Sequence, residues 1–326
     1  MLSLLPRRFA ALLATTVALA VMPATHAQAA DAWPSKSITL VSPYAPGGPT
    51  DILARLLAPY LQTALGQTVI VENRAGAGGN IGTDYVAKAK PDGYTFLVSS
   101  SGPIVISGAL YQKLPYDPKT DFTNIAPLIH TGYVIAVNPK SGLNSIQDII
   151  AHADKLSFAS AGSGTPQHII GEMFNMANKI KIQHIPYKGS GPSVTALLAG
   201  DVPMSVENPA PLMPYLKAGS IKALAITGIQ RASALPDVPT LDELGVKGFD
   251  AQPWYGFHGP AKLPAAITNR MNAEIEKILS MPEVKEKLDN LSVDIMKMSP
   301  KEFDALVQKD IVKWNAAVKA SGATVD

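Results

Sequence analysis

Short apolar runs alternate along this chain with longer segments in which apolar residues recur every three or four positions. The short runs are typical of strands and the longer segments of amphipathic helices. In the N-terminal part we expect strands at 37–41, 68–71 and 94–98, a helix at 51–65, and a second helix that follows a glycine-rich turn at 76–82. Strands that alternate with helices predict a sheet covered by helices.

The same alternation restarts after residue 130 and predicts a second α/β unit. The expected elements are strands at 133–137, 156–159, 181–185, 203–206 and 223–226, and helices at 145–153, 166–177 and up to 198. The C-terminal part is helical and carries two apolar stripes. They consist of Ile267, Met271, Ile275 and Ile278, and of Phe303, Leu306, Val307, Ile311, Trp314 and Val318. Their period of 3.6 predicts helices that pack against the first unit.

The first thirty residues have the pattern of a secretory signal peptide. Arg7 and Arg8 precede an apolar run at 9–21, and Ala27-Gln28-Ala29 fits a cleavage site. A membrane anchor is the alternative, but spanning a bilayer takes about 20 apolar residues. We therefore expect residues 1–30 to be removed on export by the general secretory route, which leaves a periplasmic protein that is not inserted in the membrane.

Composition narrows the function classes. The chain has 28 basic and 26 acidic residues, and loss of Arg7 and Arg8 would leave 26 of each, so the mature chain has no net charge and no nucleic-acid footprint. The absence of cysteine excludes a disulfide framework and a lipid-modified cysteine. We expect a monomer stabilised by its core.

Three predicted helix starts share one pattern. In each, a strand is followed by small flexible residues and then by a proline in the first turn of a helix. The three segments are 45–51 (APGGPTD), 160–166 (SAGSGTP) and 188–193 (KGSGPS).

Such helix starts suit anions. The first turn has unpaired N–H groups and the positive end of the helix dipole, and glycine lets a ligand approach the backbone. The hydroxyls of Thr50, Ser163, Thr165 and Ser190 add donors. Ordinary helix capping is the alternative for each segment, but three such starts at the carboxyl ends of strands also predict a binding cleft.

Catalytic and cofactor motifs do not fit. The run 76–82 (GAGGNIG) places Ile81 where a dinucleotide fingerprint requires glycine. Ser163 lacks the flanking glycines of a nucleophile elbow, because Ala161 and Thr165 occupy those positions. The six histidines show no metal-ligand spacing. We therefore expect a binding protein that is not an enzyme and has no cofactor and no metal.

Read in order, several runs resemble the Bug family, the extracytoplasmic receptors of tripartite tricarboxylate transporters. The runs are 33–36 (WPSK), 46–51 (PGGPTD), 71–82 (VENRAGAGGNIG), 90–94 (KPDGY), 114–118 (LPYDP), 186–189 (PYKG), 235–240 (LPDVPT) and 254–256 (WYG). Together they cover essentially the whole mature chain.

The resemblance implies an α/β fold, a two-lobed type II periplasmic binding protein (Venus flytrap) with hinge strands. Lobe 1 would comprise 31–130 and 253–326, and lobe 2 would comprise 131–252. A small carboxylate would be the ligand, and the membrane subunits of a tripartite tricarboxylate transporter would be the partners. The implied ligand-binding residues are Tyr44, Ala45, Pro46, Gly47, Gly48, Thr50, Asp51, Ser101, Ser163, Gly164, Thr165, Tyr187, Lys188 and Glu207.

Departures from the family pattern bear on the ligand. Pro49 stands where many members have a hydroxyl residue, Pro103-Ile104 stand where many have Thr-His, and Glu207 replaces an aspartate. We expect Ile104 to make one wall apolar, which favours a ligand with a hydrophobic body, such as an aromatic or medium-chain dicarboxylate. We also expect Gly47→Val and Thr165→Ala to weaken binding with little effect on stability.

Two other functions stay open at this point. An orphan binding protein that senses its ligand for a signalling protein would share every feature above. An exported hydrolase would instead convert its ligand to product.

Overall fold

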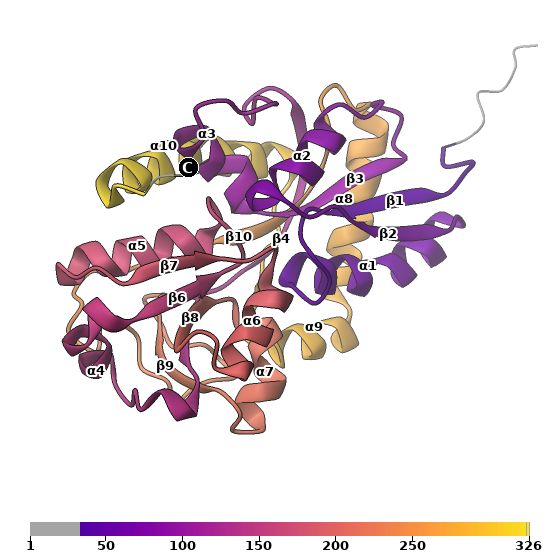
Figure 1. Ribbon diagram of the computed structural model, residues 1–326. Coiled ribbons are helices and arrows are strands. Elements are labelled where there is room, and N and C mark those ends of the chain that lie inside the picture. The colour runs from indigo at the N-terminus through magenta and orange to yellow at the C-terminus, as the bar shows by residue number, and fades with distance from the viewer. Residues whose placement is uncertain (1–32, 324, 326) are drawn as a thin grey trace, which may run out of the picture. The chain divides into compact units, whose positions relative to one another are not determined.

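The computed structural model describes residues 33–323 and residue 325, and the expected signal peptide lies outside the described residues. Residues from Trp33 onward form one compact unit that contains two sheets (Figure 1). The strands are β1 (Ile38–Ser42), β2 (Val69–Asn73), β3 (Thr95–Ser100), β4 (Phe122–His130), β5 (Val134–Val137), β6 (Ser157–Ser160), β7 (Gln183–Pro186), β8 (Met204–Glu207), β9 (Lys222–Ile226), β10 (Trp254–Pro260) and β11 (Asp294–Ile295).

Helices cover both sheets. They are α1 (Pro49–Leu65), α2 (Asn80–Ala87), α3 (Ser107–Leu110), α4 (Ile146–Ala151), α5 (Pro166–Asn178), α6 (Ser190–Ala199), α7 (Pro209–Lys217), α8 (Ala265–Ser280), α9 (Pro282–Asp289) and α10 (Pro300–Ser321). A π-helical turn at Gly102–Ile106 joins β3 to α3.

The first sheet has the strand order β11-β4-β10-β3-β1-β2. Its strands β1, β2 and β3 are parallel, whereas β10 runs antiparallel between β3 and β4. The second sheet has the order β7-β6-β8-β5-β9, with β6 parallel to β7 and β8. The expected two-lobed α/β fold is confirmed, with one lobe built on each sheet.

Side chains of the first sheet alternate between two cores, as strands covered on both faces require. In β3, Phe96 and Val98 join the core of α1 and α8, whereas Leu97 joins the core on the opposite face. That second core also contains Ile135 of the second sheet and Phe303 of α10. One continuous core therefore extends over both lobes.

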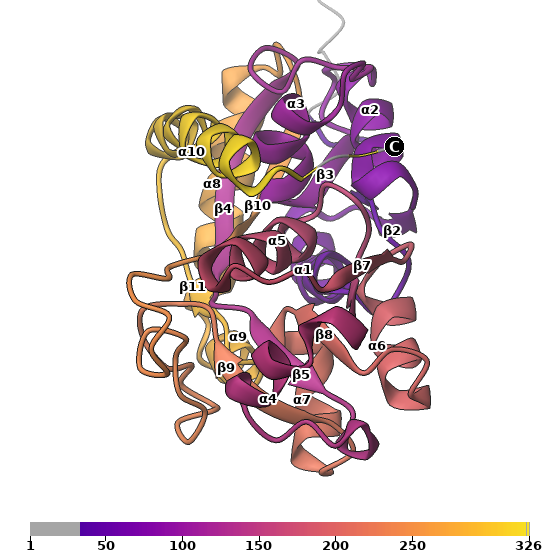
Figure 2. The same ribbon diagram turned by 60° about the vertical axis from the view of Figure 1, so that its left-hand side comes forward.

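The helix α10 begins with a capping box, in which Ser299 and Glu302 satisfy each other's backbone N–H groups. Its predicted apolar stripe packs against β4 of the first lobe, as expected, and the helix also contacts α5 of the second lobe (Figure 2). The C-terminal segment therefore joins the two lobes.

Several elements were not expected, among them β4, β10 and α7. The long strands β4 and β10 contain Pro127 and Pro260, and α7 contains Pro209, Pro211 and Pro214. Proline is unfavourable inside strands and helices, so its presence argued against predicting a strand or a helix in these segments. The chain crosses between the lobes through the segments that follow β4 and precede β10.

Candidate functional site

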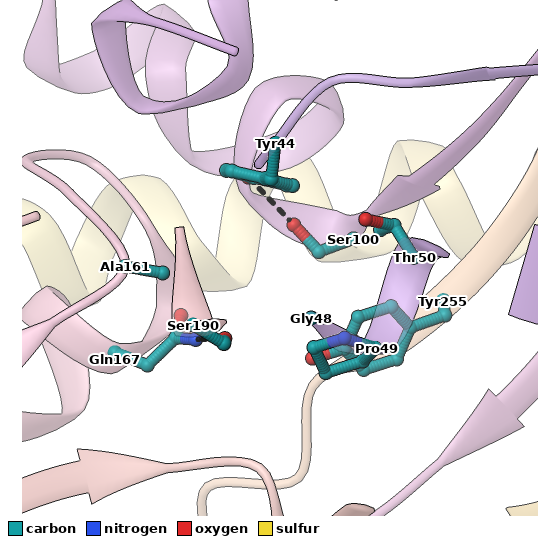
Figure 3. Close-up of a pocket in the computed structure, with 9 residues that line it drawn as sticks. All are labelled: Tyr44, Gly48, Pro49, Thr50, Ser100, Ala161, Gln167, Ser190 and Tyr255. Carbon is teal, nitrogen blue, oxygen red and sulfur yellow. Dashed lines mark hydrogen bonds between the residues drawn. The ribbon is translucent and has the colours of Figure 1, made fainter. Parts of the chain in front are cut away.

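A small cavity lies where the two lobes meet, at the carboxyl ends of the strands (Figure 3). We call it the central cavity. It is lined by Tyr44, Gly48, Pro49, Thr50, Ser100, Ala161, Gln167, Ser190 and Tyr255. Its volume of about 10 Å³ is room for about one water molecule, so a larger ligand can enter only when the lobes move apart.

The three helix starts that the sequence singled out converge on this cavity. Pro49 and Thr50 belong to the first turn of α1, Gln167 to that of α5 and Ser190 to that of α6. The first backbone N–H groups of these helices have no intrahelical partner, so three positive helix ends face one space. This arrangement can bind an anion without a lysine or arginine.

Direct contacts close the cleft. The Ala45 N–H donates to the Lys188 carbonyl at 3.1 Å, and the Tyr111 hydroxyl donates to the Ser163 carbonyl at 2.9 Å. Each bond joins a residue of the first lobe to a loop of the second.

On the first-lobe side, Tyr44 is held in place by two hydrogen bonds. Its hydroxyl donates to the Gly78 carbonyl at 3.1 Å and lies 2.9 Å from the Ser100 hydroxyl. Burial raises the pKa of Tyr44 well above its usual value, so the phenol stays neutral. Because its single proton goes to Gly78, Ser100 is the donor in the other bond.

On the second-lobe side, Glu207 lies fully buried behind the cavity wall at the end of β8. Its Oε1 accepts hydrogen bonds from Gln167 Nε2 at 2.9 Å, from the Ser190 hydroxyl at 2.8 Å and from the Asn208 N–H at 2.8 Å. Burial raises the pKa of Glu207 to about 7, against the lowering effect of these hydrogen bonds. Its Oε2 has no hydrogen-bond partner in the described part of the chain.

A model of the tripartite tricarboxylate transporter family receptor matches residues 53–323. The chain belongs to this family. Its members are receptors, which agrees with the prediction that the protein is not an enzyme. The receptor therefore binds a solute, and the resemblance found in the sequence is confirmed.

Solved structures agree with this assignment. The periplasmic binding protein BugD is 33% identical, with a TM-score of 0.86 over 90% of the receptor and 99% of BugD. Rpa4515 of R. palustris, solved with adipate, is 32% identical, with a TM-score of 0.86 over 90% and 100% of the two chains. MatC of Rhodopseudomonas palustris, with bound malate, is 32% identical, with a TM-score of 0.84 over 87% and 99%.

The residues predicted to bind ligand separate into groups in the receptor. Tyr44, Gly48 and Thr50 line the central cavity. Ser163, Tyr187 and Lys188, together with Tyr44, line a neighbouring cavity of about 350 Å³, and Ala45, Pro46, Gly47 and Tyr187 line a third, outer one. Glu207 contacts the wall of the central cavity from behind.

Two other predicted residues, Thr165 and Gly164, have internal partners. The Thr165 hydroxyl donates to the Gly162 carbonyl at 2.7 Å, and Gly164 donates its N–H to His168 Nδ1 at 3.2 Å. Ser101 is fully buried, and its hydroxyl has no partner among the described residues. Ile104 lies in the hydrophobic core and does not line the central cavity, so the argument for an apolar wall rests on Pro49 alone.

Six lining residues were absent from the predicted set, although Pro49 had been noted as a departure from the family pattern. Gln167 lies one position beyond the glycine-rich loop, inside the helix predicted at 166–177. Ser100 is the last residue of β3 and lies two positions beyond the strand predicted at 94–98. Ala161 lies in that same loop, within the motif 160–166. Tyr255 lies within the motif 254–256 but on a strand that was not predicted. Ser190 was recognised as a donor.

Asp51 does not line the central cavity and fixes the loop that precedes α1. Its carboxylate accepts from the Gly47 N–H at 3.1 Å, from Arg55 Nε at 3.0 Å and from Asn73 Nδ2 at 3.0 Å. Burial alone would raise the pKa of Asp51, but hydrogen bonds from Arg55, Gly47 and Asn73 and the charge of Arg55 lower it overall. Asp51 therefore stabilises the folded state as an anion.

Asp51→Asn is expected to lower the free energy of unfolding at pH 7 by about 1–2 kcal/mol, because it removes charge-assisted hydrogen bonds. A lowered folded-state pKa contributes stability above the unfolded value near pH 4, and this contribution disappears as the pH falls through the folded-state pKa. Urea unfolding of both proteins from pH 7 to acidic pH should show the difference shrinking below about pH 4.

The exposed Asp289 on α9 supplies a control, since Asp289→Asn is expected to change stability by less than about 0.5 kcal/mol. A constant difference between Asp51→Asn and the parent at every pH would contradict the proposed role of the carboxylate.

One expectation about variants needs correction. Gly47 has a φ of +85°, and its N–H holds Asp51, so Gly47→Val strains the unliganded receptor. Thr165→Ala removes a buried hydrogen bond to Gly162. Neither variant can separate binding from stability.

The two histidines near the cleft are held by ring stacking and a hydrogen bond within the fold. His168 and His184 stack at 3.9 Å, and the Ser160 hydroxyl lies 2.6 Å from His184 Nε2. Burial lowers the pKa of His168 to about 4, and burial together with His168 lowers the pKa of His184 to about 3. Both rings are therefore neutral at pH 7.

The described residues contain neither a cluster of metal-ligating side chains nor a helix suited to span a membrane. Within residues 33–323, His, Cys, Asp and Glu side chains form no group of three that could hold a metal ion. In the same part of the chain, no helix combines the length and apolar character needed to cross a membrane.

Proposed function

We propose that this receptor captures a small dicarboxylate in the periplasm and delivers it to the membrane subunits of a tripartite tricarboxylate transporter. The observation that carries the proposal is the convergence of three helix N-termini on the central cavity. Those N–H groups supply donors for a carboxylate, and the family membership supports the transporter as the partner.

The relatives support a dicarboxylate in particular. Rpa4515 was solved with adipate and MatC with malate, and both acids have two carboxyl groups on a short aliphatic chain. The two lobes of this receptor each bring at least one helix start to the cavity, so each can hold one carboxylate. An aromatic dicarboxylate is the second ligand type to test, because Pro49 lines the cavity.

The mechanism that follows is a hinge closure. An open receptor would bind the ligand on one lobe, and rotation about the crossing segments would bring the second lobe onto it. We propose lobe boundaries of 31–130 with 253–326, and 131–252, which agree with the strands that form each sheet. We further propose that the mature receptor is a monomer and that residues 1–30 direct its export.

A thermal-shift panel tests the ligand class. Aliphatic dicarboxylates of four to six carbons, aromatic dicarboxylates, monocarboxylates and neutral sugars would be added to the purified mature receptor. A bound ligand at 100 times its Kd is expected to stabilise the receptor by about 2.7 kcal/mol. The proposal fails if no carboxylate shifts the melting temperature while a neutral solute does.

A further inference from the structure

The hydrogen atoms of the second-lobe wall can all be assigned. Gln167 Nε2 has two, and it donates to Glu207 Oε1 at 2.9 Å and to the Ser190 hydroxyl at 3.2 Å. Ser190 has one, and it donates to Glu207 Oε1 at 2.8 Å. An ionised carboxylate only accepts, which fixes the orientation of the Gln167 amide.

The side-chain atoms left for a ligand on this wall are therefore acceptors. Gln167 and Ser190 both line the central cavity, and with their hydrogens engaged they offer the Gln167 Oε1 and the one lone pair of the Ser190 oxygen that Gln167 does not use. Ser100 on the first-lobe wall likewise offers a ligand only its oxygen lone pairs, because its hydrogen goes to Tyr44. The donors in the cavity are the backbone N–H groups of the helix starts and the hydroxyls of Thr50 and Tyr255, each of which shares a hydrogen bond with another hydroxyl.

This combination does not suit a plain carboxylate. The backbone N–H groups satisfy the carboxylate oxygens, but an adjacent methylene group would leave the buried acceptors of Gln167 and Ser190 without a partner. A hydroxyl or an ammonium group on the neighbouring carbon would satisfy them. The relatives do not decide between these ligands, because malate carries such a hydroxyl and adipate does not.

We propose that Glu207 is a positioning residue that makes this receptor select carboxylates with a hydrogen-bond donor, a hydroxyl or an ammonium group, beside the carboxylate. The inference rests on the proposed dicarboxylate-binding function. Glu207 acts through Gln167 and Ser190, whose hydrogens it withdraws from the cavity.

Protonation of Glu207 leaves this arrangement intact. Oε1 already accepts three hydrogen bonds, so an added proton belongs on Oε2. The other groups with an electrostatic or hydrogen-bond link to this carboxyl are Asn208 and the phenols of Tyr133 and Tyr255, which their raised pKa values keep neutral. Measurement at pH 8 places Glu207 above its pKa of about 7, in its ionised form.

The test compares matched triads of acids. For the aliphatic chain length that stabilises the receptor most, the plain dicarboxylate, its 2-hydroxy derivative and its 2-amino derivative would be titrated by calorimetry at pH 8. With four carbons these are succinate, malate and aspartate. We expect the hydroxy or the amino acid to bind about tenfold more tightly than the plain acid.

Two variants of Glu207 distinguish a preference for a hydroxyl group on the ligand from a preference for an ammonium group. Glu207→Gln keeps an acceptor oxygen for Gln167 and Ser190, so a hydroxyl preference should persist while an ammonium preference is lost with the charge. Glu207→Met has a similar volume without an acceptor, so it frees those hydrogens and should bring the affinity ratio of the triad to about one. If Glu207→Met does not fold, Ser190→Ala removes one cavity acceptor directly and should reduce the same ratio.

The outcomes are distinct. Equal affinities across the triad in the parent receptor overturn the inference but leave the dicarboxylate receptor standing. An unchanged ratio in Ser190→Ala or in folded Glu207→Met also overturns it. Loss of both preferences in Glu207→Gln indicates a purely structural role and overturns the assignment to Glu207. Failure of every carboxylate to bind overturns the proposed function itself.

Discussion

Gly191→Ala is expected to leave the receptor folded and to weaken ligand binding by about five- to a hundred-fold. Gly191 lies in the first turn of α6, and a methyl group there would overlap the carbonyl oxygen of Pro46 on the opposite lobe. Overpacking of this kind costs about 1–3 kcal/mol. The overlap exists only when the lobes are closed, so the penalty falls on the liganded state.

Calorimetric titration with the best ligand of the panel, together with thermal unfolding without ligand, measures both parts of this prediction. Alanine is a better helix former than glycine, so the unliganded melting temperature should stay the same or rise. Gly108→Ala in α3 is the matched control, because its methyl would lie 3.5 Å from Pro118 in ordinary contact. Full affinity in Gly191→Ala would show that binding does not require this closure.

Phe303→Ala is expected to lower the free energy of unfolding by about 3–5 kcal/mol, the largest stability effect that we predict. Phe303 is fully buried in α10 and packs edge-on against Trp254 at 5.2 Å and beside His258 at 5.3 Å. Its ring also lies against Gly256 of β10, where there is no room for another side chain. Alanine would leave a cavity at the centre of the core shared by both lobes.

Chemical unfolding measures this effect directly, and Val312→Ala is the control on the same helix. Val312 is 71% exposed, so its truncation should change stability by less than about 0.5 kcal/mol. Similar losses in the two variants would contradict the conclusion that α10 is part of the core and would instead indicate a general sensitivity of the helix.

The sequence was sufficient to predict those elements whose structure is determined by local chemistry. Proline in the first helical turn, with glycine one or two positions before it, marked the starts of α1 and α5, and the apolar period in Phe303, Val307 and Trp314 marked α10. The strands β4 and β10 could not be predicted from the residue pattern, because each contains proline and is defined by its pairing partners. Strand pairing is a long-range property that no local window contains.

The candidate site also divides into residues that local sequence could identify and residues that only the tertiary structure identifies. The three helix starts could be found from their residues, because capping and glycine requirements are local. The positions of Gln167 and Tyr255 could not, since they depend on which strands and helices meet at the cavity. The roles of Asp51 and Glu207 depended on partners that lie 22 and 40 positions away, Asn73 and Gln167.

An anchor made of main-chain N–H groups has an evolutionary consequence. Substitutions to residues other than proline keep these donors at the starts of α1, α5 and α6, because every such residue type supplies a backbone N–H. Mutation can therefore reshape the surrounding side chains and change the cargo while its anionic group is still held. A gene duplicate of such a receptor can acquire a new acid as its substrate in small steps, without first losing the ability to bind the old one.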